Sequence, residues 1–312
     1  MPTLKVTLEY DGTRYAGWQR QPDRPTIQEA VESALARITQ AQISVVGAGR
    51  TDAGVHALGQ VASFRTERVM SPEEWTRALN GVLPDDISVR SVEEVDDGFH
   101  ARYSARGKLY EYRILNRPER SALQLQRVWH LHKPLDVPAM KAAADLLVGK
   151  HDFSSFEGAL SDSDNPWCDL QRLDIRQEAD LIRIQAYADR FLKQMVRTIV
   201  GTLVEVGFKK RSPESLKDIL EARDRSAAGK TAPPHGLYLV RVDYEVQARP
   251  SESRPAGAAD TPSGSQSSRS SKNSRPPLRR ELAGQGGLGL LTGSHSRLNT
   301  VSYVRGVFLQ QG

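Results

Sequence analysis

Alternating apolar and polar positions predict a half-buried strand at the start of the chain, over residues 4–10. Helical spacing follows in two stretches, one opened by a capping pair of Thr26 and Glu29 and the other by Ser71-Pro72. Strand patterns return between and after these helices, at residues 43–46, 60–65 and 87–95. The first part of the chain therefore has the predicted order β-α-β-β-α-β.

The same order of elements recurs in the second part of the chain. Strands are predicted over residues 108–116, 170–177, 181–188 and 236–244, and helices over residues 136–147, 191–206 and a short stretch from Ser212. Two such units in tandem are typical of ferredoxin-like folds. We therefore predict an α+β fold with two tandem ferredoxin-like halves, residues 1–105 and 106–248, whose antiparallel sheets join around a central cleft that holds the active site.

The composition changes at residue 249, where Ser, Pro, Arg, Gly and Ala begin to dominate. Such a sequence cannot bury a core, so we expect residues 249–312 to form a disordered tail. This tail holds 9 of the 43 Lys and Arg but only 3 of the 38 Asp and Glu, which leaves the preceding body with 34 basic and 35 acidic residues. Nucleic-acid binding by the body must therefore depend on a local basic surface, while the tail could add salt-sensitive RNA affinity.

The cysteine, the histidines and the first residues of the chain bear on its cellular compartment and on whether it binds a metal or cofactor. The single Cys168 excludes an internal disulfide and fits a reducing compartment. The first residues lack the pattern of a signal peptide, and Lys193 and Arg197 interrupt the most apolar predicted helix, so we expect a cytoplasmic protein. The remaining histidines and Cys168 show no metal-ligand spacing, and no cofactor motif is present.

The segment most suited to chemistry is residues 47–56, which combine three glycines with Arg50, Asp52 and His56. A loop so rich in glycine allows a ligand to approach its main chain closely. Asp52 is then a catalytic carboxylate with Arg50 as its neighbouring cation, or it is an Asx-turn residue that stabilises its own loop. The residues alone leave these two interpretations open, and a phosphate-binding loop is disfavoured because the Walker and dinucleotide patterns are lacking.

Two runs of the chain interleave aromatic and basic residues, a combination that suits RNA bases and phosphates. In residues 14–20, Tyr15 and Trp18 stand among arginines. In residues 100–110 several cations precede Tyr110, which lies on the same strand face as Tyr112. The competing interpretation is ordinary core packing of these rings. Basic residues also recur at helical spacing at Arg190, Lys193 and Arg197, which indicates either a solvated helix face or a surface that faces RNA.

Five motifs, in order, resemble those of the tRNA pseudouridine synthase A family. Residues 49–56, GRTDAGVH, are similar to the active-site motif of that family. The other landmarks are YDG at 10–12 with GWQRQ at 17–21, FHAR at 99–102 with YEY at 110–112, FLKQMVR at 191–197 with VG at 200–201, and GLYLV at 236–240. The resemblance covers the chain from residue 4 to residue 244, and the order of five motifs makes it specific.

This resemblance implies a homodimer without a metal or organic cofactor that isomerises uridine to pseudouridine in the anticodon stem-loop of tRNA, at positions 38–40. By position it implies that Asp52 is the essential carboxylate and that Arg197 pairs with it. It further implies that Tyr110 stacks on the target base, that Leu237 forms an apolar wall, and that Arg50 holds the displaced strand or its phosphates.

Two features depart from the family pattern. The tail matches nothing expected of the family, and Cys168 stands where a basic residue is expected, which puts one RNA or structural contact in doubt. Two other functions also compete: a non-catalytic RNA-binding module or tRNA chaperone, suggested by the basic and aromatic runs, and a metal-dependent nuclease, suggested only by acid pairs such as Asp85-Asp86 and Asp96-Asp97.

Overall fold

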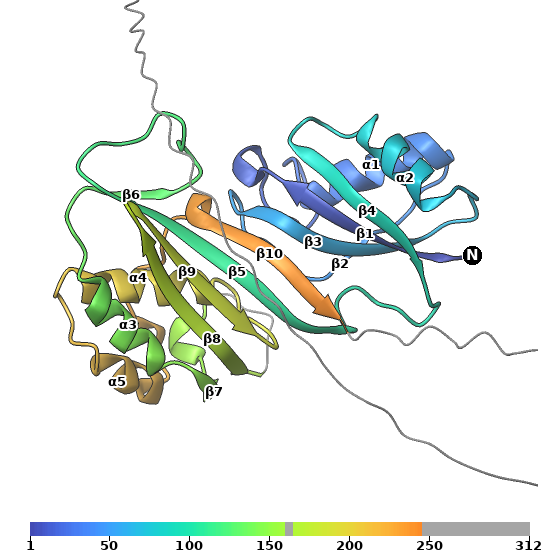
Figure 1. The fold of residues 1–312 in the computed structure, drawn as a ribbon. Helices are drawn as coiled ribbons and strands as arrows, with labels where there is room; N and C mark the ends of the chain where they lie inside the picture. The colour runs from blue at the N-terminus through green and yellow to red at the C-terminus, as the bar shows by residue number, and fades with distance from the viewer. Residues whose placement is uncertain (160–164, 245–312) are drawn as a thin grey trace, which may run out of the picture. The chain divides into compact units, whose positions relative to one another are not determined.

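The structure, a computed structural model, describes residues 1–159 and 165–244. The predicted tail, residues 249–312, lies outside the described residues. Within them, the predicted α+β class is confirmed, because a few helices lie against one large, mostly antiparallel sheet (Figure 1).

The sheet contains ten strands within the described part of the chain, eight of them in the order β4-β1-β3-β10-β5-β9-β8-β7. Their bounds are β1 Thr3–Tyr10, β3 His56–Arg65, β4 Ile87–Val95, β5 Ala105–Asn116, β7 Gly149–Asp152, β8 Trp167–Glu178, β9 Leu181–Ala188 and β10 Leu237–Tyr244. Two short strands pair at the side of this path, β2 (Val46–Gly47) with β3 and β6 (Trp129–Leu131) with β5.

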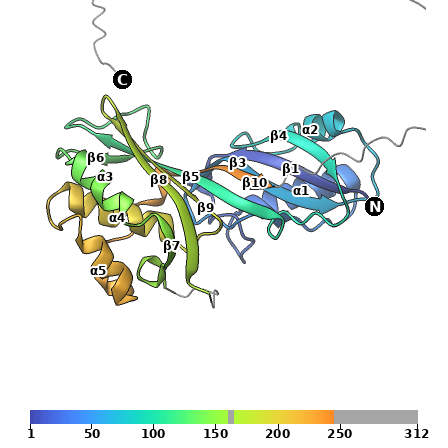
Figure 2. The ribbon, with the colours of Figure 1, turned by 60° about the horizontal axis from the view of Figure 1, so that its bottom comes forward.

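Five α-helices accompany the sheet in the described residues: α1 Ile27–Thr39, α2 Pro72–Asn80, α3 Val137–Asp145, α4 Met195–Gly207 and α5 Ser215–Ala222. Helices α1 and α2 lie near β1, β3 and β4, whereas α3, α4 and α5 gather near β7 and β8 at the other end of the sheet (Figure 2). The first helix begins as predicted, because the Thr26 side chain accepts a hydrogen bond from the Glu29 backbone N–H. The second carries a complete capping box between Ser71 and Glu74.

The last described strand, β10, lies in the middle of the sheet, between β3 and β5 (Figure 1). It pairs antiparallel with β5 but parallel with β3, where Tyr238 lies opposite His56 and Leu239 opposite Ala57. The two antiparallel parts of the sheet therefore meet edge to edge, through a short parallel ladder between β3 and β10. Because parallel strands point the same way, the residues just before β10 and the loop just before β3 lie at one end of the sheet.

Helix α4 begins four residues later than predicted. Gln194 has a left-handed backbone conformation (φ 59°), which ends the preceding loop and starts the helix at Met195. Arg190 and Lys193 therefore belong to that loop, and the predicted basic face of a longer helix is wrong. The buried side of α4 includes Met195, Ile199 and Leu203, which pack against the sheet, as their spacing predicted.

Gly201 brings a second segment close to α4. A Cβ atom at this position would overlap the carbonyl oxygen of Lys230, so the chain around residues 229–232 crosses the helix at backbone distance. Ala232 then donates its N–H to the Arg197 carbonyl oxygen at 3.0 Å. This contact fixes the segment that leads into β10 against the helix that carries Arg197.

Some strands differ from the prediction. Of residues 43–46 only Val46 lies in a strand, the two-residue β2, and the short strands β6 and β7 were not predicted. The division into two halves at residue 105 stays a prediction. None of the described helices has the length and apolar character needed to cross a membrane.

Candidate active site

The loop that carries Asp52 connects β2 and β3 and is held by the backbone of residues 15–18. Trp18 donates its N–H to the Thr51 carbonyl oxygen at 3.0 Å, and Gly54 donates to the Tyr15 carbonyl oxygen at 3.3 Å. Gly17 forms an isolated bridge with Asp52 and has a φ of 105°, and a Cβ atom there would lie 2.5 Å from the Thr51 carbonyl oxygen. This close approach requires glycine.

Buried side chains of β1 and β3 also form hydrogen bonds with this loop. The Tyr10 hydroxyl lies 2.8 Å from Thr51 Oγ1, and Gln60 donates from Nε2 to the Gly49 carbonyl oxygen at 2.8 Å. Burial raises the pKa of Tyr10 to about 12, so its hydroxyl stays neutral at physiological pH. The Asp52 loop therefore rests on hydrogen bonds that do not change with pH in this range.

The carboxylate of Asp52 pairs with Arg197, which lies 145 positions further along the chain. Arg197 Nη1 donates to Asp52 Oδ2 at 2.6 Å, while its Nε donates to the Ala232 carbonyl oxygen at 2.8 Å. The Arg197 side chain is 12% exposed and that of Asp52 is 29% exposed. Partial burial strengthens such a pair, and the second contact fixes the guanidinium, so the carboxylate is held in one orientation.

The ion-pair partner of Asp52 is therefore Arg197, whereas the spacing of the loop had suggested Arg50. Arg50 is exposed and follows Gly49 in the same loop. Within the described residues, Oδ2 of Asp52 accepts the hydrogen bond from Arg197 and Oδ1 accepts none.

Tyr110 lies on β5, close enough to Asp52 for their charges to interact. Its ring packs edge-to-face on Phe191, with ring centres 5.1 Å apart, and only 7% of the residue is exposed. Burial, followed by the nearby Tyr10 and Asp52, raises its pKa above the usual range, so the hydroxyl stays neutral. Tyr112, the alternative, is completely buried and donates its hydroxyl to the Pro233 carbonyl oxygen at 2.8 Å, which makes it a core residue.

Leu237 begins β10 and lies opposite Tyr112 in the ladder with β5, two residues along the ladder from the pair of Leu239 and Tyr110. The preceding turn contacts the Asp52 loop, since a Cβ atom at Gly54 would lie 3.1 Å from Pro234 Cγ. The structure thus brings Asp52, Arg197 and Tyr110 together and places Leu237 on the strand next to Tyr110.

The first run of aromatic and basic residues belongs to the core and to surface ion pairs. Tyr15 and Trp18 are 8% and 2% exposed and belong to the apolar core. The Tyr15 hydroxyl and the Arg14 guanidinium both bind Asp86, each at 2.6 Å. This pairing also occupies one of the acids that suggested a nuclease, and the described residues contain no group of three or more potential metal ligands.

The second run leaves an exposed ring beside cations. Tyr103 is 76% exposed and stacks on His100 with ring centres 4.3 Å apart, and the Arg102 guanidinium lies 5.7 Å from the Tyr103 ring centre. Lys108, at the end of this run, packs against Gly49 of the Asp52 loop. This surface retains the features of an RNA contact that the first run lacks.

A buried network around His56, which the sequence did not reveal, holds the far end of the loop. His56 Nδ1 lies 3.0 Å from Asp11 Oδ1, and Arg127 Nη2 lies 2.8 Å from the other oxygen of this carboxylate. The His56 ring stacks on Tyr238 of β10 with ring centres 4.8 Å apart. Burial lowers the pKa of His56 despite the Asp11 carboxylate, so the ring is neutral at neutral pH. The YDG motif contained Asp11 but gave no sign of its partners.

Cys168 occupies a core position rather than a surface one. It is 1% exposed and lies opposite His151 in the ladder of β7 and β8. Burial raises the pKa of its thiol to about 12, so it is an unreactive, neutral side chain. At this position, where the family resemblance led us to expect a basic residue, the chain has a buried side chain in the core of its second part.

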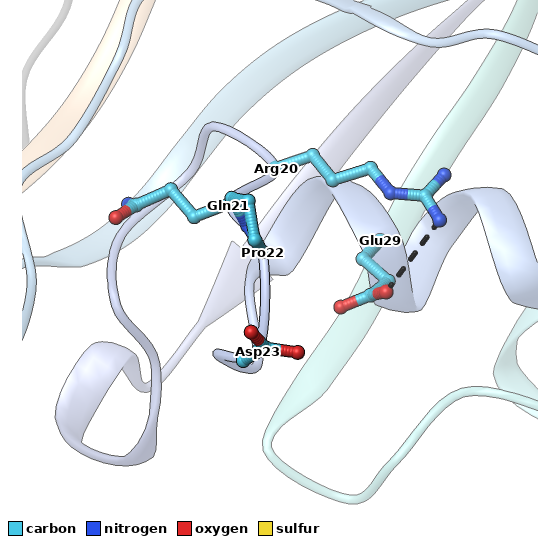
Figure 3. Close-up of a pocket in the computed structure, with 5 residues that line it drawn as sticks. All are labelled: Arg20, Gln21, Pro22, Asp23 and Glu29. Atoms are coloured by element: carbon cyan, nitrogen blue, oxygen red, sulfur yellow. Dashed lines mark ion pairs between the residues drawn. The ribbon is translucent and has the colours of Figure 1, made fainter.

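A surface hollow at the start of α1 is separate from these residues. It is lined by Arg20, Gln21, Pro22, Asp23 and Glu29, and Arg20 extends along the helix toward Glu29, with 3.7 Å between Nη2 and Oε1 (Figure 3). This hollow includes none of the five predicted site residues. The ion pair between Arg20 and Glu29 indicates a surface structure rather than a binding site.

Comparison with known proteins identifies similar sequences. A family model described as tRNA pseudouridine synthase matches residues 7–104 and 143–245. The chain is 49% identical over 246 residues to the tRNA pseudouridine synthase A of Moorella thermoacetica, which covers 78% of this chain and 100% of the relative. It is 47% identical over 247 residues to the enzyme of that name from Allorhizobium ampelinum, which covers 78% and 95%.

The double contact of Arg197 leads to a stability prediction. In Arg197→Lys a single ammonium group replaces the planar fork, so it can keep the contact to Asp52 or to Ala232 but not both. We expect the free energy of unfolding, measured by urea denaturation, to fall by about 1–3 kcal/mol. The control Arg241→Lys alters an exposed pair with Asp243 and should change it by less than about 0.5 kcal/mol. Equal effects in the two variants would contradict this account.

Proposed function

Because the chain belongs to the tRNA pseudouridine synthase family, we propose that it isomerises uridine to pseudouridine in tRNA. In this reaction the N1–C1′ bond breaks, the uracil turns, and a C5–C1′ bond forms, while C5 loses its proton and N1 gains one. The observation that supports this function best is the Asp52 carboxylate, fixed by Arg197 beside the buried ring of Tyr110. A carboxylate held in one orientation next to a flat ring suits a reaction at the sugar of a flipped nucleotide.

We assign the roles of the site residues as follows. Asp52 acts on the target nucleotide through Oδ1, either by attack on C1′ or by removal of the C2′ proton. Tyr110 stacks on the target base and Leu237 provides an apolar wall. Arg197 orients the carboxylate, and the exposed Arg50 holds the displaced strand or its phosphates.

The proposed target lies in the anticodon stem-loop, at positions 38–40. A base in a stem must leave its stack before an enzyme reaches C1′, which costs a few kcal/mol. Basic and aromatic groups near the site, among them Arg102 and the exposed Tyr103, can offset this cost through contacts with RNA.

We also infer the arrangement of the chain around this site. The strand orders β4-β1-β3-β2 and β10-β5-β9-β8 support two ferredoxin-like halves. Homodimer formation rests on the family resemblance, and a monomer mass for the full chain in light scattering would rule it out. A cytoplasmic location stays a prediction, based on the single cysteine.

The decisive variant is Asp52→Asn, which keeps the size of the side chain and removes its charge. We expect it to lower tritium release from tRNA that carries 5-³H-uridine by at least about a thousandfold, because joining C5 to C1′ expels that hydrogen. The affinity for tRNA should stay within a few-fold of the wild-type value, because a negatively charged carboxylate does not bind the phosphates of RNA. Asp145→Asn, on an exposed position of α3, is the matched control.

Other outcomes of this experiment are equally informative. If the wild-type protein binds tRNA but releases no tritium from several unmodified tRNAs, the chain is a non-catalytic RNA-binding module instead. If Asp52→Asn fails to fold, the carboxylate stabilises its own loop, and its catalytic role loses its support.

The position of the target uridine can be tested with transcripts. A tRNA whose only labelled uridines lie at positions 38–40 should release tritium, whereas the same tRNA with cytidines at these positions should release none. Retention of release in the cytidine transcript would place the target elsewhere in the tRNA.

A further inference from the structure

We propose that Lys108 binds a backbone phosphate of the RNA beside the nucleotide that enters the Asp52 site. This inference rests on the proposed function and adds to it a contact that positions the substrate. It follows from the place of Lys108 in the sheet, from the charges around it, and from its lack of a partner in the described residues.

Lys108 lies in the interior of the sheet and faces the site. It sits on β5 opposite Ala188 of β9 and Val242 of β10. Tyr110 is two residues further along, so both side chains are on the same face, separated by about 7 Å along the strand. The Lys108 ammonium reaches the Asp52 loop, since Nζ and Cε lie 3.5 Å from the point where a Cβ atom of Gly49 would be.

The surroundings of this ammonium are mainly positive. Arg102 from the loop before β5 and Arg190 from the loop after β9 both act on its charge, and Arg50 follows Gly49 in the adjoining loop. Asp189 is the acidic group that acts on it, but Asp189 Oδ1 already accepts hydrogen bonds from the backbone N–H of Asp169 at 2.9 Å and from that of Arg190 at 2.6 Å.

The charged form of the Lys108 side chain is therefore disfavoured in the protein without RNA. Burial first, and then Arg102 and Arg190, lower its pKa to about 8. In the described part of the chain its ammonium forms no ion pair within 4.0 Å, in contrast to Arg197. An anion bound against the Lys108 ammonium would offset this cost.

A phosphodiester is the anion that this place would accept. It carries one negative charge at neutral and at mildly alkaline pH, and lysine binds phosphate as a point charge. A nucleotide whose base lies against Tyr110 brings a phosphate of its backbone toward the same face of β5. Lys108 and Tyr110 then fix two ends of the nucleotide, so that its sugar lies between them, toward Asp52.

The first test is the salt dependence of tRNA binding by the full chain. Each phosphate contact contributes about 0.7–0.9 to the slope of log affinity against log salt. Lys108→Met should lower this slope by about that amount and weaken binding, whereas Lys108→Arg should keep it. Lys141→Met, at an exposed position of α3, is the control and should match the wild type.

The second test is the pH dependence of the same affinity. A pKa of about 8 means that Lys108 is charged at pH 7 and mostly neutral at pH 9, so wild-type binding should weaken by about tenfold across this range. Lys108→Arg stays charged, and its affinity should be constant. His56 and His235 have pKa values lowered by burial and change charge below this range.

These measurements separate failure of the inference from failure of the proposed function. An unchanged salt slope in a folded Lys108→Met, or a wild-type affinity that is constant from pH 7 to 9, would overturn the role of Lys108. If Lys108→Met does not fold, the comparison of wild type with Lys108→Arg across pH decides. Tritium release by the wild type is measured alongside, so that an inactive protein counts against the proposed reaction and not against this contact.

Discussion

The ion pair between Asp52 and Arg197 is the interaction on which the site depends. It joins a loop near the start of the chain to a helix 145 positions later, with 2.6 Å between Nη1 and Oδ2. Each partner is fixed by its own surroundings: Asp52 by the backbone of Gly17, and Arg197 by the carbonyl oxygen of Ala232. The carboxylate is thus preorganised before any substrate binds, which is how a polar site gains catalytic power at little cost during the reaction.

Much of the fold could be predicted from local patterns. The alternation over β1 and β4 and the capping residues of α1 and α2 determine these elements within a few residues, so they were predicted correctly. The start of α4 was missed because the helical spacing continues through residues 191–194, while Gln194 adopts a left-handed conformation that spacing does not indicate. The strands β6 and β7 are too short to show a period, and their pairing comes from the neighbouring strands.

The site was only partly visible in the sequence. Glycines on both sides of Asp52 indicated a loop open to a ligand, but they suggested Arg50 as the nearest cation, whereas the fold supplies Arg197. No spacing rule connects residues 145 positions apart, so that partner came from the resemblance to a family. No sequence pattern pointed to Lys108, because its burial and the cations near it arise only when β5, β9 and the Asp52 loop come together in the fold.

The central place of β10 has a consequence for how the protein is made. A ribosome releases the chain from its N-terminus, so β3 and β5 emerge long before residues 237–244, and until then each has an edge without its neighbour. During that interval the nascent chain already contains both Asp52 and Arg197, but the strand that closes the sheet between their two parts is missing. Completion of the site therefore coincides with insertion of the last described strand, and an interrupted translation product would present two open sheet edges to the chaperones of the cell.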